Sequence, residues 1–80
     1  MRNIIQIKLN NSIYPKKAVL EAKQAFSSYL ESTLKPVEGG VLITLNIKQV
    51  YQNDTPQIYG EFMNYLLDRT IQIALEKESI

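Results

Sequence analysis

The chain has 80 residues, 45% of them hydrophobic and 21% charged, with a formal net charge of +1. A chain of this length forms one domain and buries only about 60–65% of its unfolded surface, which leaves a stability margin of a few kcal/mol. Cysteine and histidine are both absent, which excludes disulfides, zinc sites built from these ligands, and thiol or imidazole catalysis. We therefore expect residues 1–80 to form a single domain without cofactor or metal, to which a partner subunit adds stability.

The sequence predicts a cytoplasmic protein without membrane contact. No stretch approaches the ~18 apolar residues of a membrane span. The first twelve residues alternate between apolar and polar side chains and lack a cleavage site of small residues. This pattern is typical of a strand and not of a signal peptide. The absence of cysteine suits a reducing compartment.

Charge is distributed unevenly along the chain. Residues 1–50 hold seven basic and three acidic residues, whereas residues 51–80 hold two basic and five acidic residues. This difference has two interpretations. The charged residues belong either to ordinary solvated surfaces or to a basic face that meets an acidic face across a subunit contact.

The first half of the chain predicts a strand followed by a helix. Apolar and polar residues alternate in residues 3–9, which predicts a half-buried strand. Pro15 opens a helix that we expect over residues 16–34, and Pro36 ends it because the residue before a proline avoids the α region. The apolar residues of this helix form one stripe: Ala18, Val19, Ala22, Ala25, Phe26, Tyr29 and Leu30.

The second half predicts another strand and a second helix. Residues 41–50 alternate and indicate a strand, while residues 56–80 have the helical period and indicate a long amphipathic helix. Gly60, in the first turn of this helix, lowers the stability of the helix by about 1 kcal/mol relative to alanine. Its presence is explained either by a neighbouring backbone that passes close to it or by no packing requirement at all. The core-facing side chains of this helix are expected to be Tyr59, Phe62, Met63, Leu66, Leu67, Ile73 and Ala74.

These elements predict a small α/β (α+β) fold of two layers with the order βαβα. Each strand has one apolar and one mostly polar face, so both helices are expected on the apolar side. The two strands are expected to be parallel and joined by a right-handed crossover through the first helix. A two-stranded sheet has two open edges, which invite pairing with a second copy or an extended peptide. We therefore expect a homodimer that completes the sheet.

The final helix also carries a polar stripe at spacings of three and four residues, made of Glu61, Asn64, Asp68 and Gln72. A solvated face, a partner-binding face and a pair of catalytic carboxylates are the three interpretations. No histidine or cysteine exists to accompany the carboxylates. We therefore assign no catalytic residue and take the four as candidate partner-binding residues.

Lysines near the start of the first helix offer a different interpretation. Lys16, Lys17 and Lys23 could contact phosphates of a nucleic acid. The strands carry aliphatic residues in place of an aromatic platform, and the chain is almost neutral, so nucleic-acid binding is disfavoured.

The final helix resembles a family signature. Its residues Glu61, Phe62, Asn64, Leu66, Leu67 and Asp68 follow the pattern EFxNxLLD of the HxsD-like family. These are the small proteins of His-Xaa-Ser peptide-modification systems, which also contain radical-SAM enzymes. The resemblance extends to Tyr14-Pro15 with the apolar residues that follow, and to the segment from Glu76 to Ile80. Gln72 stands where the family has arginine, and the family's further C-terminal segment is missing, so the chain resembles a diverged member.

The resemblance implies a non-enzymatic accessory or adaptor protein that works beside radical-SAM enzymes and binds a peptide or protein partner. Two alternatives come from other classes of function. One is a structural homo-oligomerisation module without a peptide ligand, and the other is a weak nucleic-acid-binding domain.

Overall fold

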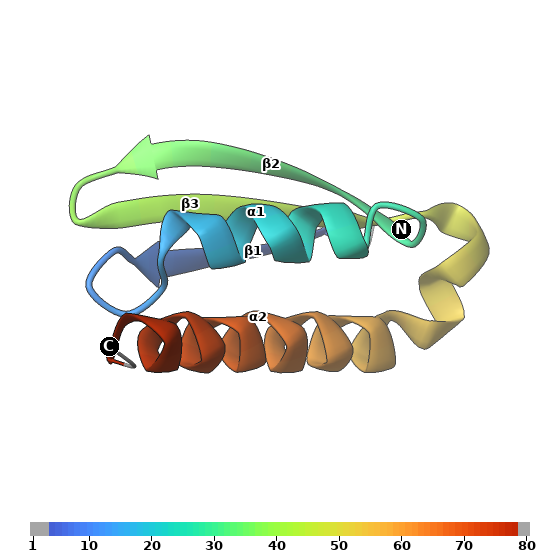
Figure 1. Cartoon of the computed structure of the whole chain (residues 1–80). Helices are drawn as coiled ribbons and strands as arrows, with labels where there is room; N and C mark the ends of the chain where they lie inside the picture. Colours follow the sequence, from blue (N-terminus) through green and yellow to red (C-terminus); the bar gives the residue numbers. More distant parts are fainter. Residues whose placement is uncertain (1–3, 79–80) are drawn as a thin grey trace.

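The computed structural model of the protein describes residues 4–78. In chain order the elements are β1 (Ile4–Asn10), α1 (Lys16–Ala25), β2 (Leu30–Val37), β3 (Gly40–Ile47), the 3-10 helix η1 (Gln49–Asp54) and α2 (Thr55–Glu78), as Figure 1 shows. The predicted start of the first strand at Asn3 and the predicted end of the final helix at Ile80 lie outside the described residues. Within them, the first strand and the final helix are confirmed. The second strand (β3) is confirmed as far as Ile47, but its predicted end at Val50 is wrong, because the 3-10 helix η1 begins at Gln49.

Three strands form one sheet in the order β1-β3-β2, and both neighbouring pairs are antiparallel. Ile7 of β1 and Leu34 of β2 both lie opposite Ile43 of β3. The small α+β fold is confirmed, but the predicted order βαβα with two parallel neighbouring strands is wrong. The helix α1 connects β1 to β2, and β3 then turns back between these two strands, antiparallel to both.

The third strand, β2, occupies residues for which the sequence predicted a helix. The first helix ends at Ala25 and not at residue 34. Ser27 and Ser28 form a turn, after which Leu30, Ser32 and Leu34 alternate with outward polar residues. Pairing with β3 through a tight turn at Gly39, whose φ of 77° favours glycine, makes this segment a strand.

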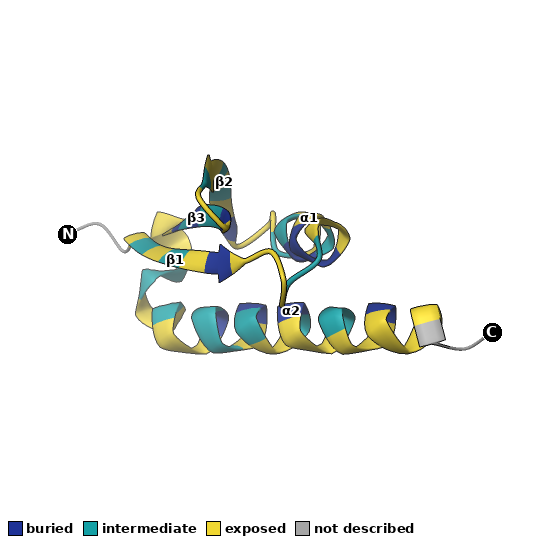
Figure 2. Ribbon diagram, turned by 90° about the vertical axis from the view of Figure 1, so that its left-hand side faces the viewer, coloured by how far each residue is buried: buried dark blue, intermediate teal, exposed yellow. Residues whose placement is uncertain are grey.

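Both helices lie on the same side of the sheet, as predicted. Figure 2 shows the sheet and α1 nearly end-on, while α2 runs across the view below β1. Ala18 and Ala22 are fully buried, and their small side chains let α1 approach α2 closely. The opposite face of the sheet is polar and largely exposed, with Gln6 and Lys35 among its residues. The buried core comprises Leu9, Leu30, Ile43, Leu45 and Ile47 from the sheet, Ala18, Val19 and Ala22 from α1, and Ile58, Phe62, Leu66 and Ile73 from α2.

Aromatic rings join the end of α1 to α2. The ring of Phe26 packs edge-on against those of Phe62 and Tyr65, with centroids 5.5 and 5.9 Å apart. Tyr29 in turn packs on Tyr51 of η1 at 5.1 Å. Such pairs add about 0.5–1.5 kcal/mol each beyond the burial of their area, so this cluster fixes the turn that leads into β2.

The apolar arc of α2 is only partly covered. Phe62 and Leu66 are fully buried as predicted, but Leu67 is 48% exposed and Ala74 is also exposed. Placing these two in the core was wrong, because the sheet and α1 together cover the arc only around Phe62. Ile71 and Leu75 are likewise about half exposed, at 49% and 60%.

Two glycines give a test of this packing. A Cβ atom on Gly40 would lie 2.1 Å from the carbonyl oxygen of Leu9, whereas a Cβ on Gly60 would meet nothing within 4 Å. We expect Gly40→Ala to lower the free energy of unfolding by about 1–3 kcal/mol through overpacking. As the matched control, Gly60→Ala should raise it by about 0.5–1 kcal/mol, because the helix gains propensity. Urea denaturation measures both, and an unchanged Gly40→Ala variant would contradict the close approach of β1 and β3.

Candidate functional site

The four predicted site residues lie together on the exposed side of α2. Glu61, Asn64, Asp68 and Gln72 are all exposed and follow one another along the helix at spacings of three and four residues. Glu61 accepts a hydrogen bond from the Gln57 side chain at 3.3 Å. We call these four residues the polar stripe. The structure thus brings together all the residues that the sequence analysis selected.

The carboxylates of the polar stripe are too far apart to work as a catalytic pair. Glu61 and Asp68 are seven residues apart on one helix, which separates them by about 10 Å along the axis. A proton shared or relayed between two groups needs hydrogen-bond distances of about 2.6–3.2 Å, or one bridging water. Both side chains also face solvent. This geometry favours a solvated or partner-binding face.

Arg69 connects the polar stripe to α1. Its Nε donates a hydrogen bond to Oε2 of Glu21 over 2.5 Å, and the two side chains are 24% and 28% exposed. Its Nη1 donates to the side-chain oxygen of Gln72 over 2.5 Å. The hydrogen bond with Glu21 is the main cause that raises the pKa of Arg69 above its ordinary value. Gln72 is therefore held in place by Arg69, and α1 is tied to α2 next to the stripe.

The outer strands of the sheet present backbone groups at two edges. Asn11 N–H donates to the carbonyl of Gly39 at one end of the β1–β3 pair, and Lys48 N–H donates to the carbonyl of Tyr29 at one end of the β2–β3 pair. Inward and outward groups alternate along an edge strand. The outward groups therefore belong to Ile4, Gln6 and Lys8 on β1, and to Ser32, Leu34 and Pro36 on β2.

The two edges differ in their ability to pair. On β2, Pro36 offers no N–H at an outward position, and the charged Glu31 and Lys35 flank the edge. On β1, the residues Ile4, Gln6 and Lys8 include no proline and one charge. The edge of β1 therefore lacks the features that protect the edge of β2 from pairing.

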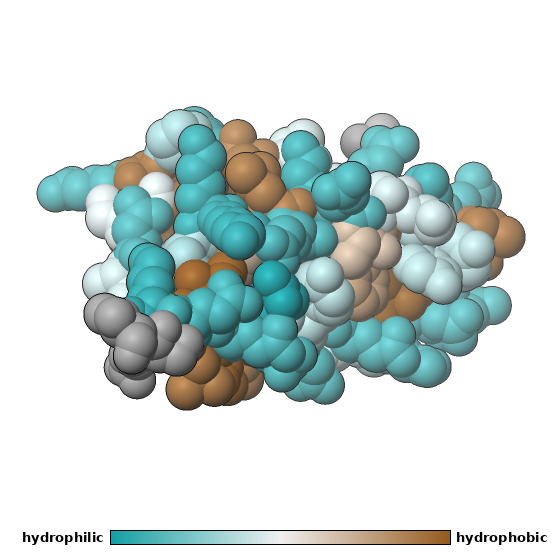
Figure 3. All heavy atoms as spheres, in the orientation of Figure 1, coloured by the Kyte–Doolittle hydropathy of each residue, from teal (hydrophilic) through white to brown (hydrophobic). Residues whose placement is uncertain are grey.

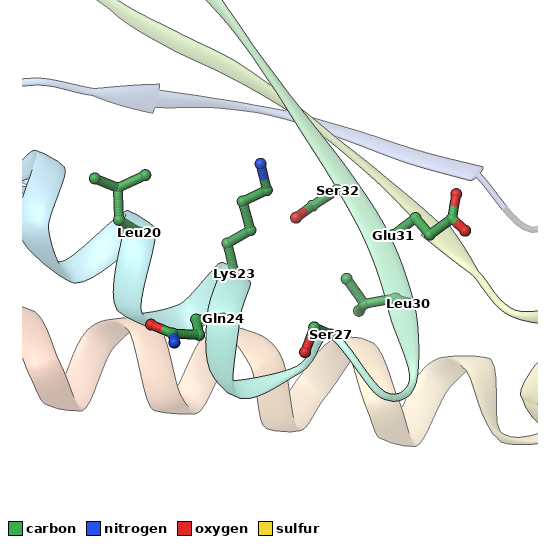
Figure 4. Close-up of a pocket in the computed structure, with 7 residues that line it drawn as sticks. All are labelled: Leu20, Lys23, Gln24, Ser27, Leu30, Glu31 and Ser32. Atoms are coloured by element: carbon green, nitrogen blue, oxygen red, sulfur yellow. The ribbon is translucent and has the colours of Figure 1, made fainter.

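A hollow of about 360 Å³ lies between α1 and β2, and Figure 4 shows its lining. The Lys23 and Ser32 side chains point into it. Among the described residues, the buried hydroxyl of Ser32 has no hydrogen-bond partner, an arrangement that costs stability. The hollow is open and mixed in polarity, with the lining Leu20, Lys23, Gln24, Ser27, Leu30, Glu31 and Ser32.

Neither a membrane span nor a metal cluster is found in residues 4–78. No helix there combines the length and the apolar character needed to cross a bilayer. No group of three or more acidic side chains is arranged there to hold a metal ion. Compared with family models, curated proteins and solved structures, the chain matches none. The functional argument therefore rests on the residues and their arrangement.

The Arg69–Glu21 pair can be measured by a double-mutant cycle of Arg69→Gln and Glu21→Gln. We expect a coupling free energy of about 0.5–1 kcal/mol at low salt, falling in about 1 M NaCl because ions screen a pair that solvent reaches. Glu38→Gln, in the β2–β3 turn, serves as the control and should be additive with Arg69→Gln to within about 0.3 kcal/mol. Zero coupling between Arg69 and Glu21 at low salt would show that the pair does not tie the helices.

Proposed function

We propose that the chain is a non-enzymatic accessory or adaptor protein of the cytoplasm, which binds a peptide or protein partner and works as a homodimer. The proposal rests on the segment of α2 that resembles the family signature, Glu61 to Asp68. Some of its side chains are buried in the core and others are exposed on the surface. Phe62 and Leu66 are fully buried and serve the fold. Glu61, Asn64 and Asp68 are exposed, so the fold does not require them and an outside partner gives them a role.

The chemistry of the polar stripe defines the kind of partner. Glu61 and Asp68 are acceptors, while the amides of Asn64 and Gln72 both donate and accept. Such a ridge fits a peptide or protein surface that offers lysine, arginine or backbone N–H groups. The acidic excess of residues 51–80 adds attraction for a basic partner over longer distances.

The biological setting follows from the resemblance to the HxsD-like family. In a radical-SAM peptide-maturation system, the chemistry belongs to the radical-SAM enzyme, and an accessory protein holds the enzyme or its precursor peptide. This chain would need no cofactor or metal of its own for that work. The open edge of β1 supports one alternative, a purely structural homo-oligomerisation module, which would show self-association without any partner.

The proposal is tested by measuring binding of the purified chain to a radical-SAM enzyme and to a precursor peptide of a His-Xaa-Ser system. We expect binding in the micromolar range, weakened at least about tenfold by the double variant Asn64→Ala/Asp68→Ala, because both side chains would lose partner contacts. The control Thr33→Ala/Lys35→Ala, on the polar face of the sheet, should bind like the wild type. Isothermal titration calorimetry measures both.

Two results would contradict the proposal. One is no binding of either candidate at about 100 µM, a concentration at which even modest interfaces are populated. The other is equal weakening by the two double variants. A salt-dependent interaction with generic DNA or RNA, lost on replacing Lys16 and Lys17, would support nucleic-acid binding in its place.

A further inference from the structure

We propose that a pocket at the start of α2 binds an arginine side chain of the partner. We call it the ring pocket, and its walls come from the turn after α1, from η1 and from the first two turns of α2. The inference rests on the proposed function and deepens it, because it names the side chain by which the partner is recognised. Three aromatic rings and two carboxylates line the pocket together, those of Phe26, Tyr29, Tyr51, Asp54 and Glu61.

Segments that are distant in the sequence build this pocket. Phe26 and Tyr29 belong to the turn after α1, and Tyr51 belongs to η1. Figure 1 shows this turn and η1 at the same end of the molecule, where α2 begins. Figure 3 shows pale and brown atoms, which belong to residues of intermediate and high hydropathy, over the end of α1 and this turn.

The size of the ring pocket suits a single side chain. Its volume is about 220 Å³, and it opens to solvent. Pockets for drug-sized ligands are larger, roughly 300–1,000 Å³. One side chain that enters from a bound peptide or protein therefore fits this space better than a separate small molecule does.

The rings of the pocket are inclined to one another. The planes of Phe26 and Tyr29 make an angle of 54° at a centroid distance of 6.3 Å, and those of Tyr29 and Tyr51 make an angle of 61° at 5.1 Å. Neither pair is stacked face to face, and Tyr29 is 42% exposed, so parts of the ring faces are open to a ligand. Aromatic faces attract cations through the ring quadrupole, and they contact arginine more often than lysine.

Both charged residues of the pocket are acidic. Asp54, at the end of η1, and Glu61 are exposed. The ion pair between Arg69 and Glu21 is the only one in residues 4–78, so neither carboxylate of the pocket has a cationic partner there. The partial positive charge at the start of α2 is about half an elementary charge, which is less than the two full charges of the carboxylates. The pocket therefore attracts a cation.

Arginine combines the two features of the pocket in one side chain. Its planar guanidinium stacks on aromatic faces, and its N–H donors match the geometry of a carboxylate. The ammonium of lysine is more strongly hydrated and has no plane to stack. The buried side chain of Ile58 adds an apolar wall for the methylene groups of arginine.

The ring pocket continues the polar stripe at its N-terminal end. Glu61 belongs to both, and Gln57, which also lines the pocket, donates a hydrogen bond to Glu61 at 3.3 Å. From Glu61 the stripe extends along α2 to Gln72, over about 16 Å by the helical rise. A partner segment that lies along the stripe therefore reaches the pocket at one end, where its arginine enters.

Titration of the purified chain with the Nα-acetyl amide of arginine, followed by NMR, tests the inference without the partner. We expect saturable changes in the resonances of Tyr29 and Tyr51 with a Kd in the millimolar range, because one side chain makes only a few weak contacts. The matching amide of citrulline has a similar shape without the charge, and its Kd should be at least about fivefold higher. The amide of lysine should bind at least about twofold more weakly than that of arginine.

The double variant Asp54→Asn/Glu61→Gln removes both charges from the pocket and nearly keeps the shape of the side chains. It should raise the Kd of the arginine amide at least about fivefold. Tyr29→Leu should weaken binding as well, because an aromatic face is lost at an exposed position. The control is Glu38→Gln/Glu76→Gln, which removes the same charge from exposed residues at the other end of the molecule (Figure 1). Its Kd should remain within about twofold of the wild type, because salt screens distant charges.

The inference is overturned by the absence of any saturable change at about 100 mM arginine amide, or by a citrulline or lysine amide that binds as tightly. Equal weakening by the two double variants would also overturn it, since the attraction would then come from the overall charge. The NMR spectra report at the same time whether each variant is folded.

These outcomes are distinguishable from those of the proposed function. A chain that binds the maturation partner but not the arginine amide would lose the ring pocket and keep the proposed function. A chain that binds the arginine amide but no maturation partner would keep the ring pocket alone.

Discussion

The packing of α2 against the sheet determines most of the structure. Phe62 and Leu66 of α2 are fully buried between the sheet and α1, and the ring of Phe26 packs on Phe62 from the end of α1. Burying each of these side chains stabilises the fold by about 1.5–3 kcal/mol, a large share of the margin of an 80-residue domain. The apolar arc of α2, however, is wider than three strands and a ten-residue helix can cover. What remains outside the core is the flank around Leu67.

The same constraint explains why the edges of the sheet matter. A small domain without disulfides or metal gains stability mainly by burying more surface, and a partner is the remaining means. The two outer strands differ, since β2 is protected by Pro36 while β1 is not. The helix α2 is thus divided into a buried column around Phe62, exposed apolar residues around Leu67, and the polar stripe.

Local periodicity was sufficient to predict β1, β3, α2 and the grouping of the polar stripe. The missed strand β2 shows where it fails. Leu30 and Leu34 are four residues apart, a spacing that suits a helix and an alternating strand equally. The choice between them is made by pairing with β3, which a reading of residues 16–34 alone does not include. The Arg69–Glu21 contact was missed for the same reason, since its partners are 48 residues apart. Leu67 and Ala74 were placed in the core because a helical wheel gives the width of an apolar arc but not how much of it the sheet covers.

The measurement that tests this account most directly is amide hydrogen exchange along β1, followed by NMR in dilute solution. The account predicts that Ile5, Ile7 and Leu9, paired with β3, are protected from exchange. The amides of Gln6 and Lys8 should exchange rapidly, because they point to the open edge of the sheet. Protection of Gln6 and Lys8 would show an edge that is already covered, and rapid exchange of Ile5, Ile7 and Leu9 would show that β1 does not pair with β3. Either result would contradict the account.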